Sequence, residues 1–206
     1  MTARRLLTAA AAGYLLGTIP SADLAAMAAT GGAIDLRATG SGNPGGLNAA
    51  NVLGRRWGYG VMAADVAKGA LACTAGRVVA GDLGAHVGGT SAVIGHCFPV
   101  WNGFRGGKGV AASVGQCLAT FPVYVPIDLA VAAATAALPK WKRRALAATL
   151  TASLGWVAGG IVWWRRGWPN GWGPRPTGAL PLAAAASSAV ILYRFAAARP
   201  PVETTP

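Results

Sequence analysis

The residues best suited to chemistry lie in two glycine-rich stretches of the chain. The first stretch, residues 40–48, mixes small polar side chains with glycines. Its candidate site residues are Gly40, Ser41, Gly42, Asn43 and Asn48. A hydroxyl, two amides and exposed backbone N–H groups in one loop can bind an anion such as phosphate. The same composition would also suit an ordinary flexible turn, so both interpretations stay open.

Asn43 and Pro44 together predict where a helix begins. Asparagine is a favoured N-cap residue, and proline is favoured at the first helical position. A short helix from Pro44 to about Leu53 would then point its positive end at the loop, where an anion would be stabilised.

The second stretch, residues 95–110, contains a histidine and a lysine. Its candidates are His96, Arg105, Gly106, Gly107, Lys108 and Gly109. The pattern is not a Walker A loop, because Gly109 follows the lysine where that motif needs Ser or Thr. Lys108 stands where an apolar helix begins, a position at which a cation needs an anion beside it. The alternatives are a lysine that reaches the lipid headgroups and a histidine that only makes structural hydrogen bonds.

Two further groups of charges are candidates. Residues 140–144 form a basic run that contains Arg143; such a run usually marks topology, with binding of an acidic substrate as the alternative. Asp65 and Lys68 lie three positions apart, so one helix face can pair them. Asp23 and Asp128 have no evident partner in the sequence.

The elements that must position these residues are membrane-spanning helices. Hydrophobic residues make up 53% of the 206 and charged residues only 12%, about half the usual charged fraction. This composition excludes a disordered chain and disfavours a soluble enzyme. A bilayer core requires about 20 apolar residues per helix. The predicted spans cover residues 6–29, 58–80, 83–101, 109–121, 122–138, 146–164 and 178–195.

The basic residues predict the orientation of these spans. The net charge is +12, and the basic residues fall between apolar runs, so we expect membrane lipids as partners and no nucleic acid. Residues 30–57, 102–108, 139–145 and the C-terminus carry 11 Lys and Arg, against six on the other side. The positive-inside rule therefore puts both glycine-rich loops in the cytoplasm and the N-terminus outside.

The two stretches together resemble a known family. Residues 40–43 with Asn48, then 95–96, 98–101 and 104–111, are similar to the motifs of the PlsY-type acyl-phosphate:glycerol-3-phosphate acyltransferases. Residues 13–21, 65–69 and 193–194 add weaker similarity in the same order. The resemblance covers nearly the whole chain.

The resemblance implies an all-α, polytopic protein of the cell membrane, with about seven transmembrane helices and short cytoplasmic catalytic loops. Residues 1–206 would form a single membrane-embedded domain. It implies acyl transfer from acyl phosphate to glycerol 3-phosphate, which gives lysophosphatidate for phospholipid synthesis without metal or cofactor. His96, Ser41 and Asn43 would be catalytic. The substrate and phosphate ligands would be Gly40, Gly42, Asn48, Arg105, Gly106, Gly107, Lys108, Gly109 and Arg143.

The sequence departs from the family pattern where the acceptor is expected to bind. Asn51 and Leu146 stand in place of an arginine and a serine, and Phe195 begins a C-terminal segment that lacks an expected histidine and asparagine. The alternatives are therefore a divergent paralogue with another acceptor or no activity, or a small transporter of a phosphorylated solute. Transporters often have polar sites at the bilayer midplane, whereas these motifs lie in loops on one side.

Overall fold

The computed structural model describes residues 2–140 and 143–198, and these residues form helices with no strand among them. The helices are α1 (Ala3–Gly17), α2 (Ser21–Thr30), α3 (Gly46–Val52), α4 (Arg55–Cys97), α5 (Val110–Thr120), α6 (Val125–Ala137), α7 (Arg144–Arg166) and α8 (Ala179–Ala196). Two short 3₁₀ turns, η1 (Val100–Asn102) and η2 (Pro122–Tyr124), complete them. The predicted all-helical fold is confirmed.

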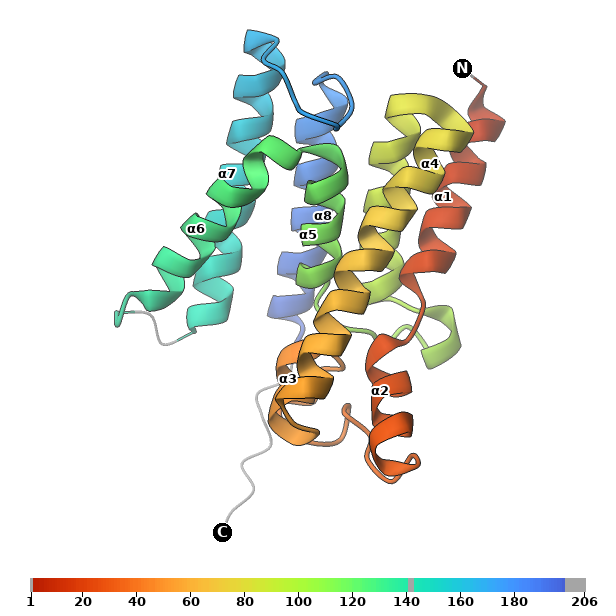
Figure 1. Ribbon diagram of the computed structural model, residues 1–206, viewed down its shortest axis with the longest axis vertical. Helices are drawn as coiled ribbons and strands as arrows, with labels where there is room; N and C mark the ends of the chain where they lie inside the picture. Colours follow the sequence, from red (N-terminus) through yellow and green to blue (C-terminus); the bar gives the residue numbers. More distant parts are fainter. Residues whose placement is uncertain (1, 141–142, 199–206) are drawn as a thin grey trace.

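Successive helical segments run alternately between the two ends of the bundle (Figure 1). Helix α4 supplies two of them, because it is broken at Ala80 and Gly81, where Gly81 has a φ of +61°. Its two arms match the predicted spans 58–80 and 83–101. Both glycine-rich loops lie at one end of the bundle, and the α7–α8 connection lies at the other (Figure 1).

The helices differ in their ability to cross a bilayer. By length and apolarity, α7 and α8 qualify, and α5 with α6 would add one more if the pair forms a single broken span, bent by 118°. Helix α1 has only 15 residues, fewer than the roughly 20 that a full crossing requires. The bundle thus combines long apolar helices with shorter ones around a polar centre.

The first predicted span is wrong as a single helix over residues 6–29. Helix α1 ends at Gly17 and α2 begins at Ser21, with Pro20 between them. Proline has no N–H to continue the ladder and disfavours helical geometry at the residue before it. The break leaves the Ile19 carbonyl outside both helices, where it accepts from the Ser21 N–H at 3.0 Å and can accept a second hydrogen bond from another element.

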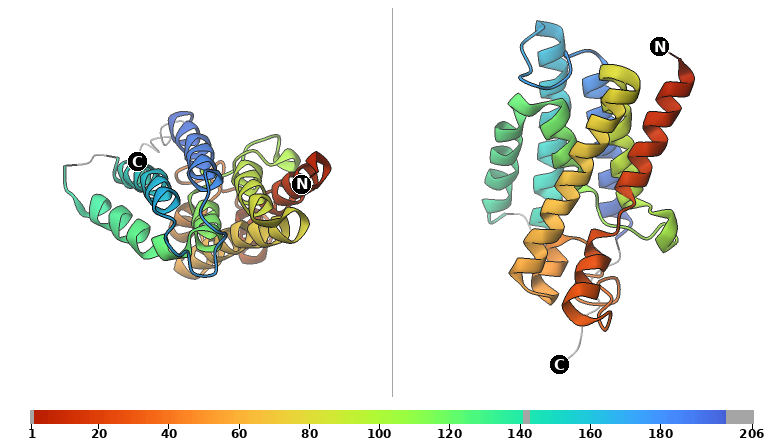
Figure 2. Two further views of the ribbon diagram at one scale, coloured as in Figure 1. Left: turned by 90° about the horizontal axis from the view of Figure 1, so that it is seen from above. Right: turned by 45° about the vertical axis from the view of Figure 1, so that its right-hand side comes forward.

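Small residues allow the helices to approach closely, as is common in membrane bundles. Helix α1 packs along the second arm of α4, and a Cβ atom on Gly17 would collide with the backbone of Ala92. Viewed from the end, α6 and α7 form the outer side of the bundle opposite α1, with α4 and α5 between (Figure 2). This packing brings the break after α1 against both arms of α4.

Candidate active site

A narrow polar pocket lies where the break between α1 and α2 meets the two arms of α4. Its walls are formed by residues 17–23, Arg37, Pro44, Asp65, Lys68, His96, Pro99, Gly106 and Gly107. The cavity is about 20 Å³, enough for about one water molecule.

Asp65 and Lys68 form a buried ion pair at the base of this pocket. The Lys68 Nζ lies 2.9 Å from Asp65 Oδ1, and the two side chains are only 6% and 4% exposed. Lys68 Nζ also donates to the Ile19 carbonyl at 3.0 Å, which the helix break has left available. The predicted pairing is confirmed, and the bond from Lys68 to Ile19 ties α4 to the segment that follows α1.

His96 comes from the end of the other arm of α4. Its Nδ1 lies 3.6 Å from Asp65 Oδ1, and the Nε2 side faces Gly107 so closely that a Cβ on that glycine would collide with Nε2. A carboxylate behind one imidazole nitrogen leaves the other to exchange a proton, which is the arrangement of a general base. The predicted catalytic role of His96 remains a prediction.

The first glycine-rich loop is organised by Asn48. The Asn48 amide donates to the carbonyls of Leu36 and Thr39, both at 2.9 Å, and its Oδ1 accepts from the backbone N–H of Ser41 at 2.9 Å. Gly40 has a φ of +63°, and a Cβ there would collide with Asn48 Oδ1. Asn48 thus contributes to the site by fixing the conformation of the loop. Ser41 is exposed and Asn43 is half-buried.

The predicted helix start in this loop is wrong by two residues. Helix α3 begins at Gly46 with Gly45 as N-cap, rather than at Pro44 with Asn43 as N-cap. The reason is a tight turn in which Gly45 N–H donates to the Asn43 carbonyl at 2.9 Å. Pro44 of this loop lines the pocket, together with Arg37 just before the loop.

The second glycine-rich loop folds back onto the end of α4. The N–H groups of Gly106 and Gly107 donate to the carbonyls of Cys97 and His96, at 3.2 and 3.1 Å. These two amides therefore hold the loop against His96 and are already engaged in the structure. The Arg105 side chain is exposed, so it can reach an anion at the surface.

Lys108 and Gly109 complete this loop at the start of α5. Gly109 has a φ of +88° and is the N-cap of α5. The Lys108 ammonium lies 4.4 Å from the centre of the Phe195 ring on α8. Burial and the nearby Arg194 guanidinium lower the pKa of Lys108. Lys108 is thus half-buried between α5 and α8, in contact with an aromatic ring rather than extended toward solvent.

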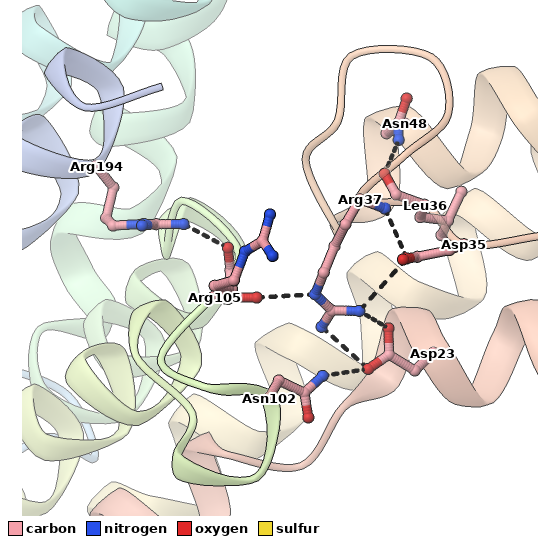
Figure 3. Close-up of polar contacts among 9 residues, drawn as sticks. Asp23, Asp35, Leu36, Arg37, Asn48, Asn102, Arg105 and Arg194 are labelled. Atoms are coloured by element: carbon pink, nitrogen blue, oxygen red, sulfur yellow. Dashed lines mark hydrogen bonds and ion pairs between the residues drawn. The ribbon is translucent and has the colours of Figure 1, made fainter. Parts of the chain in front are cut away.

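Several residues of the site have no clear signal in the sequence. Asp23, for which no partner was evident, pairs with Arg37 and accepts from Asn102 (Figure 3). Arg37 lies just before the first glycine-rich loop, Asn102 lies in the second, and Arg194 reaches the second loop from α8. The contacts of Asp23 had no signal in the sequence, because its partners lie 14 and 79 positions away. For Arg194 the only signal was the weak similarity of residues 193–194.

The third predicted stretch stands apart from these two loops. Arg143 is exposed at the start of α7, and α7 packs against α6 and α8. Trp141 and Lys142 lie outside the described residues. The predicted ligand role of Arg143 therefore remains a prediction.

An apolar groove begins beside the polar pocket. It shares Ile19 and Ser21 with the pocket and continues along α2 and one face of α4, past Trp57, Gly60 and Ala64. Its volume is about 320 Å³. A polar pocket that lies beside an apolar groove suits a substrate with a charged head and a long hydrocarbon tail.

These features define a class of protein: a helical membrane protein whose candidate catalytic His–Asp pair lies between two glycine-rich loops. The glycerol-3-phosphate acyltransferase family model matches residues 7–199, and the chain belongs to this family. The protein is accordingly an integral membrane protein.

Individual relatives agree with this assignment. A glycerol-3-phosphate acyltransferase of Maricaulis maris is 41% identical over 165 residues, covering 77% of this chain and 71% of the relative. The protein of the same name from Exiguobacterium sibiricum is 44% identical over 111 residues, or 54% and 53% of the two chains. The match with the latter thus spans only about half of that relative's length.

Solved structures with a similar fold agree with the family assignment. A crystal structure of PlsY (YgiH), an integral membrane glycerol 3-phosphate acyltransferase in its glycerol 3-phosphate form, superposes with a TM-score of 0.71 at 29% identity. The match covers 93% of this chain and 88% of that one. The lysphosphatidic acid form of PlsY gives a TM-score of 0.70 at 27% identity.

Proposed function

We propose that this protein transfers an acyl group from acyl phosphate to a hydroxyl of glycerol 3-phosphate, giving lysophosphatidate and phosphate. The observation that carries the proposal is the position of His96, whose Nε2 faces the second loop while Asp65 lies behind the ring. Family membership supports the same reaction class, as does a structural relative with glycerol 3-phosphate and lysphosphatidic acid forms. The family match favours this enzyme over a transporter.

In the proposed step, the acceptor hydroxyl oxygen attacks the acyl carbon of acyl phosphate. The hydroxyl proton passes to His96 Nε2, the new ester C–O bond forms, and the bond from the acyl carbon to the phosphate oxygen breaks. The proton then goes to the departing phosphate, so atoms and charge balance. Acyl phosphate is already activated, so positioning and charge stabilisation supply most of the catalysis.

The two loops would hold the phosphate groups. Ser41 and Asn43 on the first loop offer a hydroxyl and an amide, and Arg105 and Lys108 on the second offer charge. A phosphate near Lys108 would compensate the cation at the start of α5, which otherwise opposes the helix dipole.

The apolar groove would hold the acyl chain. Because it shares Ile19 and Ser21 with the polar pocket, a phosphate in the pocket and a hydrocarbon chain in the groove can belong to one molecule. The groove is lined mostly by apolar side chains, including Leu24 and Trp57, whose burial against a methylene chain is favourable.

The membrane would be the cell membrane, with both loops on the cytoplasmic side. The distribution of basic residues supports this orientation, and both loops lie at the same end of the bundle (Figure 1). Single cysteines at Ala38 and Phe104 should resist an impermeant thiol reagent in intact cells, whereas one at Arg166 should react. The three native cysteines are buried. Labelling of the first two from outside would refute the orientation.

The direct test of the reaction uses purified protein with acyl phosphate and glycerol 3-phosphate. Phosphate release and lysophosphatidate formation are followed together and should occur in equal amounts. His96→Gln should abolish both signals. Phosphate release without lipid product would indicate that another acceptor, or water, is used instead.

A further inference from the structure

Three successive carbonyl groups of the second loop accept hydrogen bonds from two arginines. Arg37 and Arg194 approach this loop from opposite sides (Figure 3). Arg37 Nε donates to the Arg105 carbonyl at 2.9 Å. Arg194 Nη2 donates to the Gly106 carbonyl at 2.6 Å, and its Nε donates to the Gly107 carbonyl at 3.2 Å. The two arginines lie in the connection between α2 and α3 and on α8, so the second loop is fixed between parts of the chain that are distant in sequence.

Arg37 is itself fixed by carboxylates. Its Nη1 and Nη2 donate to the two oxygens of Asp23 at 2.6 and 3.0 Å, and Asp35 Oδ1 lies 3.7 Å from Nη1. Asn102 Nδ2 donates to the same Asp23 carboxylate at 2.6 Å. The guanidinium charge is therefore balanced within the protein, so Arg37 is poorly suited to bind a phosphate although it lines the pocket.

Arg194 approaches from the other side of the loop. Its guanidinium lies 5.3 Å from the centre of the Phe98 ring, and its side chain ends on the two glycine carbonyls. A planar guanidinium can donate two hydrogen bonds in fixed directions, which a lysine ammonium cannot do in the same geometry. An Arg194→Lys substitution therefore keeps the charge but should lose the paired hydrogen bonds.

We propose that Arg37 and Arg194 are positioning residues that act together as a clamp on residues 105–107. The clamp holds Gly107 against His96 Nε2 and thereby fixes the second loop relative to the catalytic histidine. Glycine-rich segments lose much conformational entropy on ordering, and the two guanidinium groups offset that loss. Asp23 extends the clamp to α2, so the walls of the pocket and the second loop are held as one unit. The inference rests on the proposed acyl transfer for its kinetic effect.

The test compares Arg37→Lys, Arg194→Lys and Asp23→Asn, with Arg166→Lys at the opposite end as a matched control. We expect each clamp variant to lower kcat on the order of tenfold or more, because misplacement near 1 Å is costly, while KM for glycerol 3-phosphate changes little. The Asp23→Asn/Arg37→Lys double variant should have a kcat no lower than that of the less active single variant, since both substitutions weaken the same contact between Arg37 and Asp23. Arg166→Lys should match the native protein.

Hydrogen–deuterium exchange gives a readout that does not depend on the reaction. Peptides covering residues 99–109 should exchange faster in the clamp variants than in the native protein, with unchanged exchange in α7. Asn102→Ala, which removes only one bond to Asp23, should give a smaller change in the same direction if the arginine variants do not fold. An Arg37→Lys variant with native kcat and native exchange would overturn the clamp. A raised KM with unchanged exchange would also overturn it and make Arg37 a phosphate ligand. Loss of activity in the native protein itself would instead refute the proposed function.

Discussion

The Nε2 atom of His96 occupies the space into which a side chain on Gly107 would extend. The same glycine donates its N–H to the His96 carbonyl at 3.1 Å. Backbone and side chain of one histidine thus both contact a single glycine of the second loop. This relationship explains physically why the loop requires glycine beside the histidine, since any Cβ atom would displace the ring.

Gly107→Ala should therefore lower kcat by about a hundredfold, because the methyl group pushes the imidazole away from its position. The Pro44 carbonyl, 3.1 Å from the same Cβ position, leaves little room on the other side. The control is Gly178→Ala at the opposite end, where the Cβ would meet Trp164 at an ordinary 3.4 Å. Equal kcat values for the two variants would contradict the assigned contact.

The buried Asp65–Lys68 pair makes a separate prediction for stability. Asp65→Asn leaves Lys68 charged and unpaired, which typically costs about 3–5 kcal/mol. Asp65→Asn combined with Lys68→Met removes both charges and should recover most of the loss in thermal unfolding experiments in detergent. Catalytic activity should stay low in both variants, because His96 has lost the carboxylate behind its ring. Recovery of activity in the double variant would show that Asp65 does not orient His96.

The sequence predicted the helical architecture well because apolar length and positive charge report directly on membrane spans. It predicted the two loops and His96 because glycines, amides and a histidine at those spacings favour anion and proton chemistry. It missed the break at Pro20 as a structural feature, since the surrounding residues are apolar enough to continue a span. The break matters because it places the Ile19 carbonyl outside a helix, where Lys68 donates to it.

The tertiary partners of the charged residues could not be predicted in this way. Asp23 had no visible partner because Arg37 lies 14 positions away and Asn102 lies 79 positions away. Asn48 looked like a phosphate ligand from its type, yet all of its assigned hydrogen bonds close the first loop. A residue type indicates what a side chain can bind, whereas the fold decides which of those partners is within reach.

Lys108 should show its role in the pH dependence of activity. Its pKa is lowered by burial and by the Arg194 charge, so the ammonium loses its proton at a lower pH than an exposed lysine does. If the charged form binds phosphate, activity should fall as the pH rises through that pKa, and Lys108→Arg should move the fall to higher pH. Lys108→Ala should lower the activity by about ten- to a hundredfold, which is more than Lys142→Ala should lower it. An unchanged alkaline profile in Lys108→Arg would contradict this assignment.

The apolar groove makes a prediction about the length of the acyl chain. A side chain on Gly60 would extend into open space in the groove, with no atom within 4 Å of its Cβ. Gly60→Leu should therefore disfavour long acyl phosphates relative to short ones. Lost contact with about two methylene groups, at about 0.8 kcal/mol each, would lower kcat/KM for a long acyl phosphate relative to a short one by about tenfold. Ala130→Leu, on the exposed side of α6, should leave the ratio unchanged. A changed ratio in both variants, or in neither, would exclude the groove as the chain site.

The acceptor site gives the last prediction, because the sequence departs there from the family pattern. Asn51 is exposed on α3, in place of the expected arginine, and Phe195 packs against Lys108 in place of the expected histidine. Arg55 and Arg56 follow at the start of α4, although the Arg56 guanidinium stacks 5.3 Å from the Trp57 ring centre. Each lost contact to glycerol 3-phosphate is typically worth about 1–3 kcal/mol. We expect acyl phosphate to bind normally and glycerol 3-phosphate to bind weakly.

The measurement is KM for glycerol 3-phosphate in the native protein, in Asn51→Arg and in the Arg55→Ala/Arg56→Ala double variant. Asn51→Arg should lower KM by about tenfold, since one charge-assisted hydrogen bond to phosphate is restored. The double variant should raise KM if either arginine compensates for the missing one, while KM for acyl phosphate stays constant in all three proteins. A low native KM that survives loss of both arginines would contradict the account, because the acceptor would then be held by groups elsewhere in the pocket. A high native KM for glycerol 3-phosphate that Asn51→Arg lowers would show that the chain is a family member whose acceptor site has diverged.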